Sequence, residues 1–131
     1  MAMTTIEIRK SIQNLVEQDE EMRRAYMYLD QTMDWPINET FQLMILLDEV
    51  KKRMKDDVVH ITYKKKDGST RHAYGTRDNE VIVRHEGAML PPKEKQPAHA
   101  LGTFPYYDIE RQAWRCFKLE GLMDIDRGYT I

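Results

Sequence analysis

The chain has almost no cysteine: Cys116 is the only one among its 131 residues. An internal disulfide and any zinc site built from several cysteines are therefore excluded. No apolar run approaches the roughly 20 residues needed to cross a bilayer, and residues 1–7 lack the basic start and apolar stretch of a signal peptide. We therefore expect a cytoplasmic protein that does not enter a membrane, with Cys116 packed as a plain thiol in a strand.

Catalytic and metal-binding motifs are also missing. The four histidines show no metal-ligand spacing, the glycines form no phosphate-cradling loop, and the paired carboxylates at 56–57 and 124/126 are typical of turn caps. We therefore expect a non-catalytic protein that holds no metal and no cofactor.

Charge is divided unevenly along the chain. Residues 1–50 carry four basic and ten acidic groups, whereas residues 51–131 carry sixteen basic and twelve acidic groups. With 41% apolar residues the chain can build a modest core, so it is not disordered by composition. An acidic arm beside a mildly basic body is the pattern of a module with two kinds of partner, although Glu-rich helix surfaces alone also explain it.

Residues 1–55 predict a helical arm of two helices. Thr4 or Thr5 can cap the first helix, which should end near Asp30, and the acidic stretch 17–21 either kinks or interrupts its apolar stripe. The second helix should start around Pro36 and end in a basic cluster, where the helix dipole favours positive charge. The apolar faces of the two helices are formed by Ile8, Ile12 and Leu15, and by Phe41, Met44 and Leu47.

Residues 56–131 predict an antiparallel β module, because the apolar period changes to two. A first hairpin pairs residues 59–64 with 70–76 across a Lys-Asp-Gly turn, and a second pairs 104–109 with 113–118. A short strand is expected at 81–83, a Pro-rich surface loop at 85–101, and a last strand at 123–125 after a single turn. Five of these six short strands, with a tight turn before the last, match the plan of SH3-like and Sm-like barrels. The predicted fold class is therefore α+β, two helices followed by a small antiparallel five-stranded SH3/Sm-like barrel.

Two segments of this β module resemble the WYL-2 family. Residues 59–76 combine an aromatic strand, a Lys-Asp-Gly turn and an Arg-x-Ala-x-Gly-Thr return, and residues 106–125 contain a Trp-Arg-x-Phe strand at 114–117. The resemblance implies an Sm-like SH3 barrel, often phage-encoded and largely without a defined function. The stretch 115–122 is similar to the ending of the larger group of WYL domains, which are ligand- or nucleic-acid-sensing barrels. The Trp-Tyr-Leu tripeptide of that group is absent here, so we carry over only the fold.

The candidate binding residues gather on the two hairpins. Basic side chains near the first turn neutralise phosphates without reading sequence, and aromatic side chains beside Arg115 offer stacking surfaces. The same lysines also suit solubility, and aromatic residues in strands are more often core. The candidates are Lys64, Lys65, Lys66, Arg71, Tyr74, Tyr107, Trp114, Arg115 and Lys118.

Two functions follow from these patterns. The first is a binding module that acts as a nucleic-acid-associated accessory or regulatory protein through its basic hairpin. The alternative is a protein–protein interaction module, such as a phage-encoded protein that engages a host protein, which self-associates through its helical arm. Alternation leaves open whether Trp114 or Phe117 faces the core.

Overall fold

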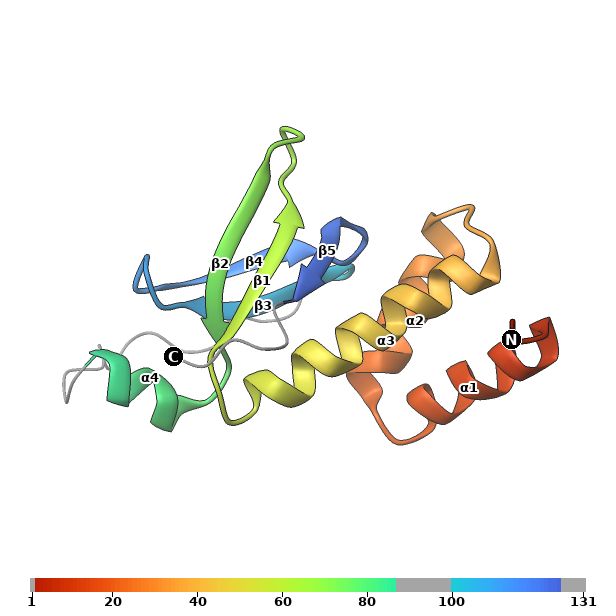
Figure 1. Cartoon of the computed structure of the whole chain (residues 1–131), viewed down its shortest axis with the longest axis horizontal. Helices are drawn as coiled ribbons and strands as arrows, with labels where there is room; N and C mark the ends of the chain where they lie inside the picture. The colour runs from red at the N-terminus through yellow and green to blue at the C-terminus, as the bar shows by residue number, and fades with distance from the viewer. Residues whose placement is uncertain (1, 87–99, 126–131) are drawn as a thin grey trace.

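The computed structural model describes residues 2–86 and 100–125 as a helical arm joined to a five-stranded antiparallel sheet (Figure 1). The helices of the arm are α1 (Thr5–Glu17), α2 (Glu20–Thr32) and α3 (Ile37–Met54). The sheet contains β1 (Val59–Lys64), β2 (Thr70–Thr76), β3 (Thr103–Asp108), β4 (Ala113–Lys118) and β5 (Leu122–Ile125). Helix α4 (Asn79–Glu86) lies between β2 and β3 in the chain, and a 3-10 turn, Leu119–Gly121, precedes β5.

The arm contains three helices, so the prediction of two was wrong. Helix α1 ends at Glu17, and the carboxylate of Asp19 then accepts hydrogen bonds from the backbone N–H groups of Glu21 and Met22, at 3.1 and 3.3 Å. A side chain that satisfies the free N–H groups of a new first turn stabilises a helix start at that point. The acidic stretch therefore interrupts the expected long helix, and it does so through a cap.

Replacing Asp19 with alanine should lower the free energy of unfolding by about 1–2 kcal/mol, because the N-cap of α2 is lost. Asp19 also pairs with Lys51 of α3, at 2.6 Å. Asp19→Asn keeps the capping oxygen without the charge and should recover most of the loss in a urea titration. Equal losses in the two variants would show that the ion pair, and not the cap, holds α2 in place.

The arm and the sheet share one hydrophobic core. Buried side chains from α2 and α3, among them Leu29, Met44 and Leu47, pack in the same cluster as Ile61 of β1 and Tyr106 of β3. Of the apolar side chains on the predicted helix faces, Ile8, Ile12, Met44 and Leu47 are buried and Leu15 and Phe41 are partly buried. With three helices packed against one another, the arm buries much of these apolar faces itself.

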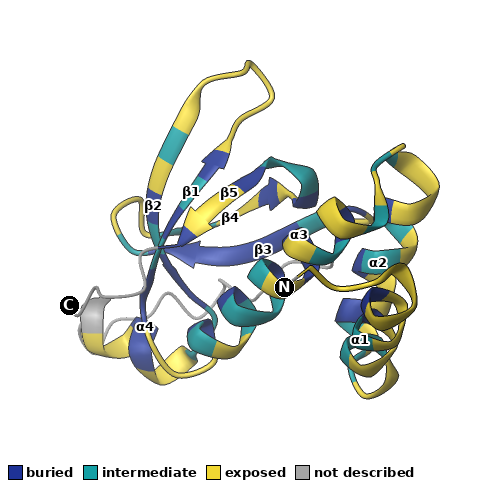
Figure 2. Cartoon of the chain, turned by 45° about the vertical axis from the view of Figure 1, so that its right-hand side comes forward, coloured by how far each residue is buried: buried dark blue, intermediate teal, exposed yellow. Residues whose placement is uncertain are grey.

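The sheet has the strand order β4-β3-β2-β1-β5. Both predicted hairpins are confirmed: Lys64 pairs with Thr70 beside the first turn, and Asp108 pairs with Ala113 beside the second. In the first turn Gly68 has a φ of 88°, a value that favours glycine. Figure 2 shows β3 buried along most of its length, whereas the tip of the β1–β2 hairpin is exposed.

The short strand predicted at 81–83 was wrong, because these residues lie in α4. The Asp78 side chain accepts from the backbone N–H of Glu80 at 2.8 Å, and its carbonyl accepts from that of Ile82 at 3.0 Å. Val81 and Ile82 are buried together while Val83 is exposed, which is a helical and not an alternating pattern. Of the predicted loop at 85–101, residues 85 and 86 end α4 and residues 87–99 lie outside the described residues.

Arg77, just after β2, ties the arm to the sheet. Its guanidinium makes two hydrogen bonds of 2.7 Å to the carboxylate of Glu21 in α2, and its Nε donates to the carbonyl of Pro105 at 2.8 Å. The same group lies 3.7 Å from the ring centre of Phe104. In the part of the chain that the structure describes, no helix is long and apolar enough to cross a membrane.

Candidate nucleic-acid interface

A groove of about 710 Å³ separates the β1–β2 hairpin from β4. We call it the basic groove. Its lining residues are Tyr63, Lys64, Lys65, Lys66, Asp67, Arg71, Thr103, Arg111, Trp114, Arg115, Cys116, Phe117 and Lys118. The tip of the β1–β2 hairpin extends beyond the rest of the sheet, as Figures 1 and 2 show from two directions.

Positive charge dominates this groove. Among the lining residues that the structure describes, seven are lysine or arginine, and Asp67 is the one carboxylate. Asp67 accepts hydrogen bonds from the backbone N–H and the hydroxyl of Ser69, at 2.9 and 2.6 Å. These bonds hold the pKa of Asp67 below its ordinary value and tie the carboxylate to its own turn. The groove thus presents a surplus of donors and positive charge to a ligand.

The structure brings seven of the nine sequence-predicted residues together in the basic groove and leaves out Tyr74 and Tyr107. The Tyr74 ring stacks on His60 with the ring centres 4.7 Å apart. Tyr107 is only 1% exposed, and its ring meets that of Trp114 edge to face. Neither tyrosine therefore offers a free face within the groove.

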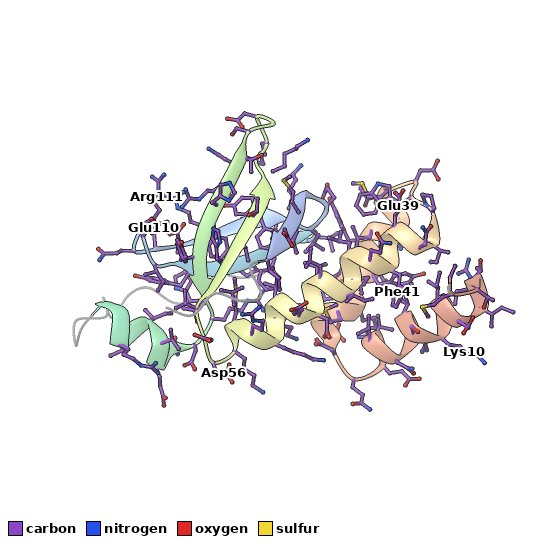
Figure 3. The ribbon with its side chains drawn as sticks, viewed as in Figure 1. Lys10, Glu39, Phe41, Asp56, Glu110 and Arg111 are labelled. Carbon is purple, nitrogen blue, oxygen red and sulfur yellow. The ribbon has the colours of Figure 1, made fainter. Side chains whose placement is uncertain are left out.

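Sequence reasoning missed Arg111. This residue lies in the turn between β3 and β4, where its backbone N–H donates to the carboxylate of Asp108 at 3.0 Å, and its exposed side chain lines the basic groove. Figure 3 shows it beside Glu110 at the end of the β3–β4 hairpin. In the sequence Arg111 is only a charged residue in a predicted turn, and such a residue by itself does not indicate a binding site.

Arg71 is the most constrained of the basic side chains. Its guanidinium lies 2.5 Å from a carboxylate oxygen of Asp108, which is fully buried, while the Arg71 side chain is 16% exposed. Burial alone would lower the pKa of Arg71, but the hydrogen bonds and charge interactions with Asp108 and Tyr106 raise it overall. Its buried Nε has no hydrogen-bond partner among the described residues. Arg71 therefore neutralises a buried carboxylate at the floor of the groove.

The aromatic side chains of the groove divide into a floor and one exposed platform. Phe117 is buried and stacks between Phe104 and Tyr63, at 5.1 and 5.2 Å between ring centres. The hydroxyl of Tyr63 hydrogen-bonds that of Tyr106, and burial followed by this bond raises the pKa of Tyr106, so its phenol stays protonated. Trp114 is partly exposed and is supported from behind by Tyr107. The ambiguity between Trp114 and Phe117 is thus resolved, with Phe117 in the core.

Other features of the described residues do not form a comparable site. No group of three or more His, Cys, Asp or Glu side chains in this part of the chain is arranged to hold a metal ion. A smaller cavity of about 260 Å³ lies between α2 and residues 100–104. Among its described lining residues the charged ones are Glu20, Glu21 and Arg24, and Glu21 already pairs with Arg77 and Lys51.

Comparison with known proteins identifies the family but not an activity. A relative from Enterobacteria phage T4, described as an uncharacterized 11.5 kDa protein in the Gp31–cd intergenic region, is 24% identical over 87 residues, which are 66% of this chain and 83% of the relative. No solved structure matches the chain. Residues 47–123 match the model of WYL_2, which is described as having an Sm-like SH3 β-barrel fold. Because this match spans more than half of the chain and agrees with the observed five-stranded sheet, the chain belongs to the WYL_2 family.

Proposed function

We propose that the chain is a non-catalytic nucleic-acid-binding module that acts in the cytoplasm as an accessory or regulatory protein. The observation that carries this proposal is the basic groove. Its described lining contains seven lysine and arginine residues and a single carboxylate, which is bonded to its own turn. The whole chain has a net charge of −2, so this positive surface is a local feature and not a consequence of composition.

The chemistry of the groove suits a phosphodiester backbone. Lysine and arginine side chains neutralise phosphates and release bound counterions, which gives affinity without sequence readout. Trp114 adds one partly exposed ring at which a base can stack, next to the exposed Arg115. We therefore expect the chain to bind nucleic acid with little sequence preference and with an affinity that depends strongly on salt concentration.

The alternative, a protein-interaction module that self-associates through the helical arm, has less support. The apolar side chains that suggested it are wholly or partly buried within the chain itself. A phage-encoded partner of a host protein remains compatible with the phage T4 relative, whose printed description assigns no function.

Reversing the charge of the hairpin tip should abolish most nucleic-acid binding. The variant Lys64→Glu/Lys65→Glu/Lys66→Glu replaces three exposed basic side chains at the rim of the groove. We expect affinity for a labelled oligonucleotide at low salt to fall by at least about a hundredfold, and the salt dependence to weaken by roughly 2–3 in the log–log slope. Fluorescence anisotropy measures both quantities on single-stranded and duplex probes. The variant leaves Arg71 in place, because that side chain has a structural partner.

The matched control is the variant Arg9→Glu/Lys10→Glu/Lys55→Glu. These three basic residues are exposed on the helical arm and lie outside the basic groove, and the variant has the same net charge as the hairpin variant. It should lose much less affinity. Equal losses would show that binding follows net charge alone, and no binding of the unmodified chain at low salt would remove the proposal.

A further inference from the structure

A second groove, of about 410 Å³, lies between α3 and β5 and carries the opposite charge. It is called here the acidic groove. Its exposed or partly exposed apolar side chains come from three segments: Trp35 before α3, Ile45 and Leu46 on α3, and Met123 on β5. Its charged lining residues are Glu39, Glu120 and Asp124, with no lysine or arginine among the described residues.

The apolar part of this groove includes two strongly exposed side chains. Ile45 is 44% and Met123 is 52% exposed, although both are large apolar side chains. Single exposed residues of this kind are ordinary on protein surfaces, whereas several that gather in one hollow with a polar rim mark an interaction site.

One carboxylate of the acidic rim, Glu120, is held by a neighbouring side chain. Both carboxylate oxygens of Glu120 lie within hydrogen-bonding distance of the Tyr28 hydroxyl, at 3.0 and 3.1 Å. Glu120 belongs to the 3-10 turn, Asp124 to β5, and Glu39 to the first turn of α3. Figure 3 shows Glu39 far from Arg111 of the basic groove. Three carboxylates on one side of the molecule create a field that repels phosphate and attracts lysine and arginine.

We propose that the acidic groove docks a basic, amphipathic segment of a partner protein. Apolar side chains of that segment contact Ile45, Leu46 and Met123, and its flanking lysine or arginine side chains pair with the three carboxylates. This role uses other residues than nucleic-acid binding, because the two grooves share none of their described lining residues. A module with both grooves joins a nucleic acid on one side to a basic protein segment on the other.

The intrinsic fluorescence of the chain provides a direct test, because it contains only two tryptophans. In the Trp114→Phe variant, Trp35 is the only tryptophan and lines the acidic groove. A synthetic peptide of leucine and lysine with an amphipathic helical pattern, about four turns long, is the probe. We expect saturable binding with a blue shift of the Trp35 emission, weakened by salt, and no binding of a peptide with glutamate in place of lysine.

Two charge variants decide whether the groove is responsible. Ile45→Lys/Met123→Lys should weaken peptide binding by at least about tenfold, equivalent to 1.4 kcal/mol. The control, Ile6→Lys/Met27→Lys, makes the same change at two exposed apolar residues outside the groove and should bind normally. Circular dichroism checks that both variants are folded.

Four results would overturn the proposal. They are an unchanged Trp35 emission, an equal loss of binding in both double variants, a dimer that dissociates only in Ile45→Lys/Met123→Lys, and peptide binding that appears only in a chain ending at Ile125. The third result would make a second copy the occupant of the groove, and the fourth would make residues 126–131 the occupant.

Discussion

Replacing Arg71 with alanine is expected to lower the free energy of unfolding by about 3–5 kcal/mol, because it leaves a buried carboxylate without its cation. Asp108 is fully buried, and its remaining described partner is the backbone N–H of Arg111. The energy of a charge without a counterion in such a site far exceeds that of an exposed ion pair. Urea unfolding followed by circular dichroism measures the loss.

The double variant Arg71→Ala/Asp108→Asn should recover part of this loss, because it removes the buried charge together with its partner. Arg115→Ala is the matched control within the basic groove. Arg115 is exposed, so its replacement should change stability by less than about 0.5 kcal/mol while lowering oligonucleotide affinity. A loss below about 1 kcal/mol in Arg71→Ala would mean that Asp108 finds another partner or is protonated.

The second large effect is expected for Arg77→Ala, with a loss of about 3–4 kcal/mol in unfolding free energy. The Arg77 side chain is 10% exposed and makes contacts with the arm and with β3 at the same time. Its planar guanidinium bonds Glu21 through two nitrogens and Pro105 through a third, a geometry that an ammonium group does not reproduce. Arg77→Lys should therefore recover less than half of the loss.

The control for Arg77 is Arg24→Ala, which removes an exposed arginine from α2 and should have little effect. The loss in Arg77→Ala should persist at high salt, because partly buried ion pairs are screened much less than exposed ones. If the unfolding free energy of Arg77→Ala differs from that of the parent by less than about 1 kcal/mol, the shared core alone holds the arm to the sheet.

Local signals in the sequence predicted most of the sheet. The Asp67-Gly68 turn, the alternation in β1 and the aromatic strands β3 and β4 are read from neighbouring residues, and both hairpins form as expected. The same local reasoning was wrong at residues 81–83. Three β-branched residues in a row favour a strand, but the Asp78 cap starts a helix whose buried side suits Val81 and Ile82.

Contacts between residues far apart in the chain could not be predicted from the sequence. Arg71 and Asp108 are 37 positions apart and Arg77 and Glu21 are 56 apart, so neither pair has a local signature. Seven of the nine predicted binding residues lie together in the basic groove, because they flank two hairpins that the fold places side by side. Arg111 also lines the basic groove, because the fold places the turn between β3 and β4 beside it.

The pairing of β5 with β1 has a consequence for protein synthesis. Strand β1 is complete at Lys64, yet its second edge pairs with β5 (Leu122–Ile125), where Ile61 lies opposite Ile125. A ribosome must therefore translate about 60 further codons before that edge finds its partner. Until then the nascent chain presents an unpaired strand edge, which is a template for pairing with other chains. Prematurely terminated products that lack β5 should accordingly be targets for chaperones and proteases.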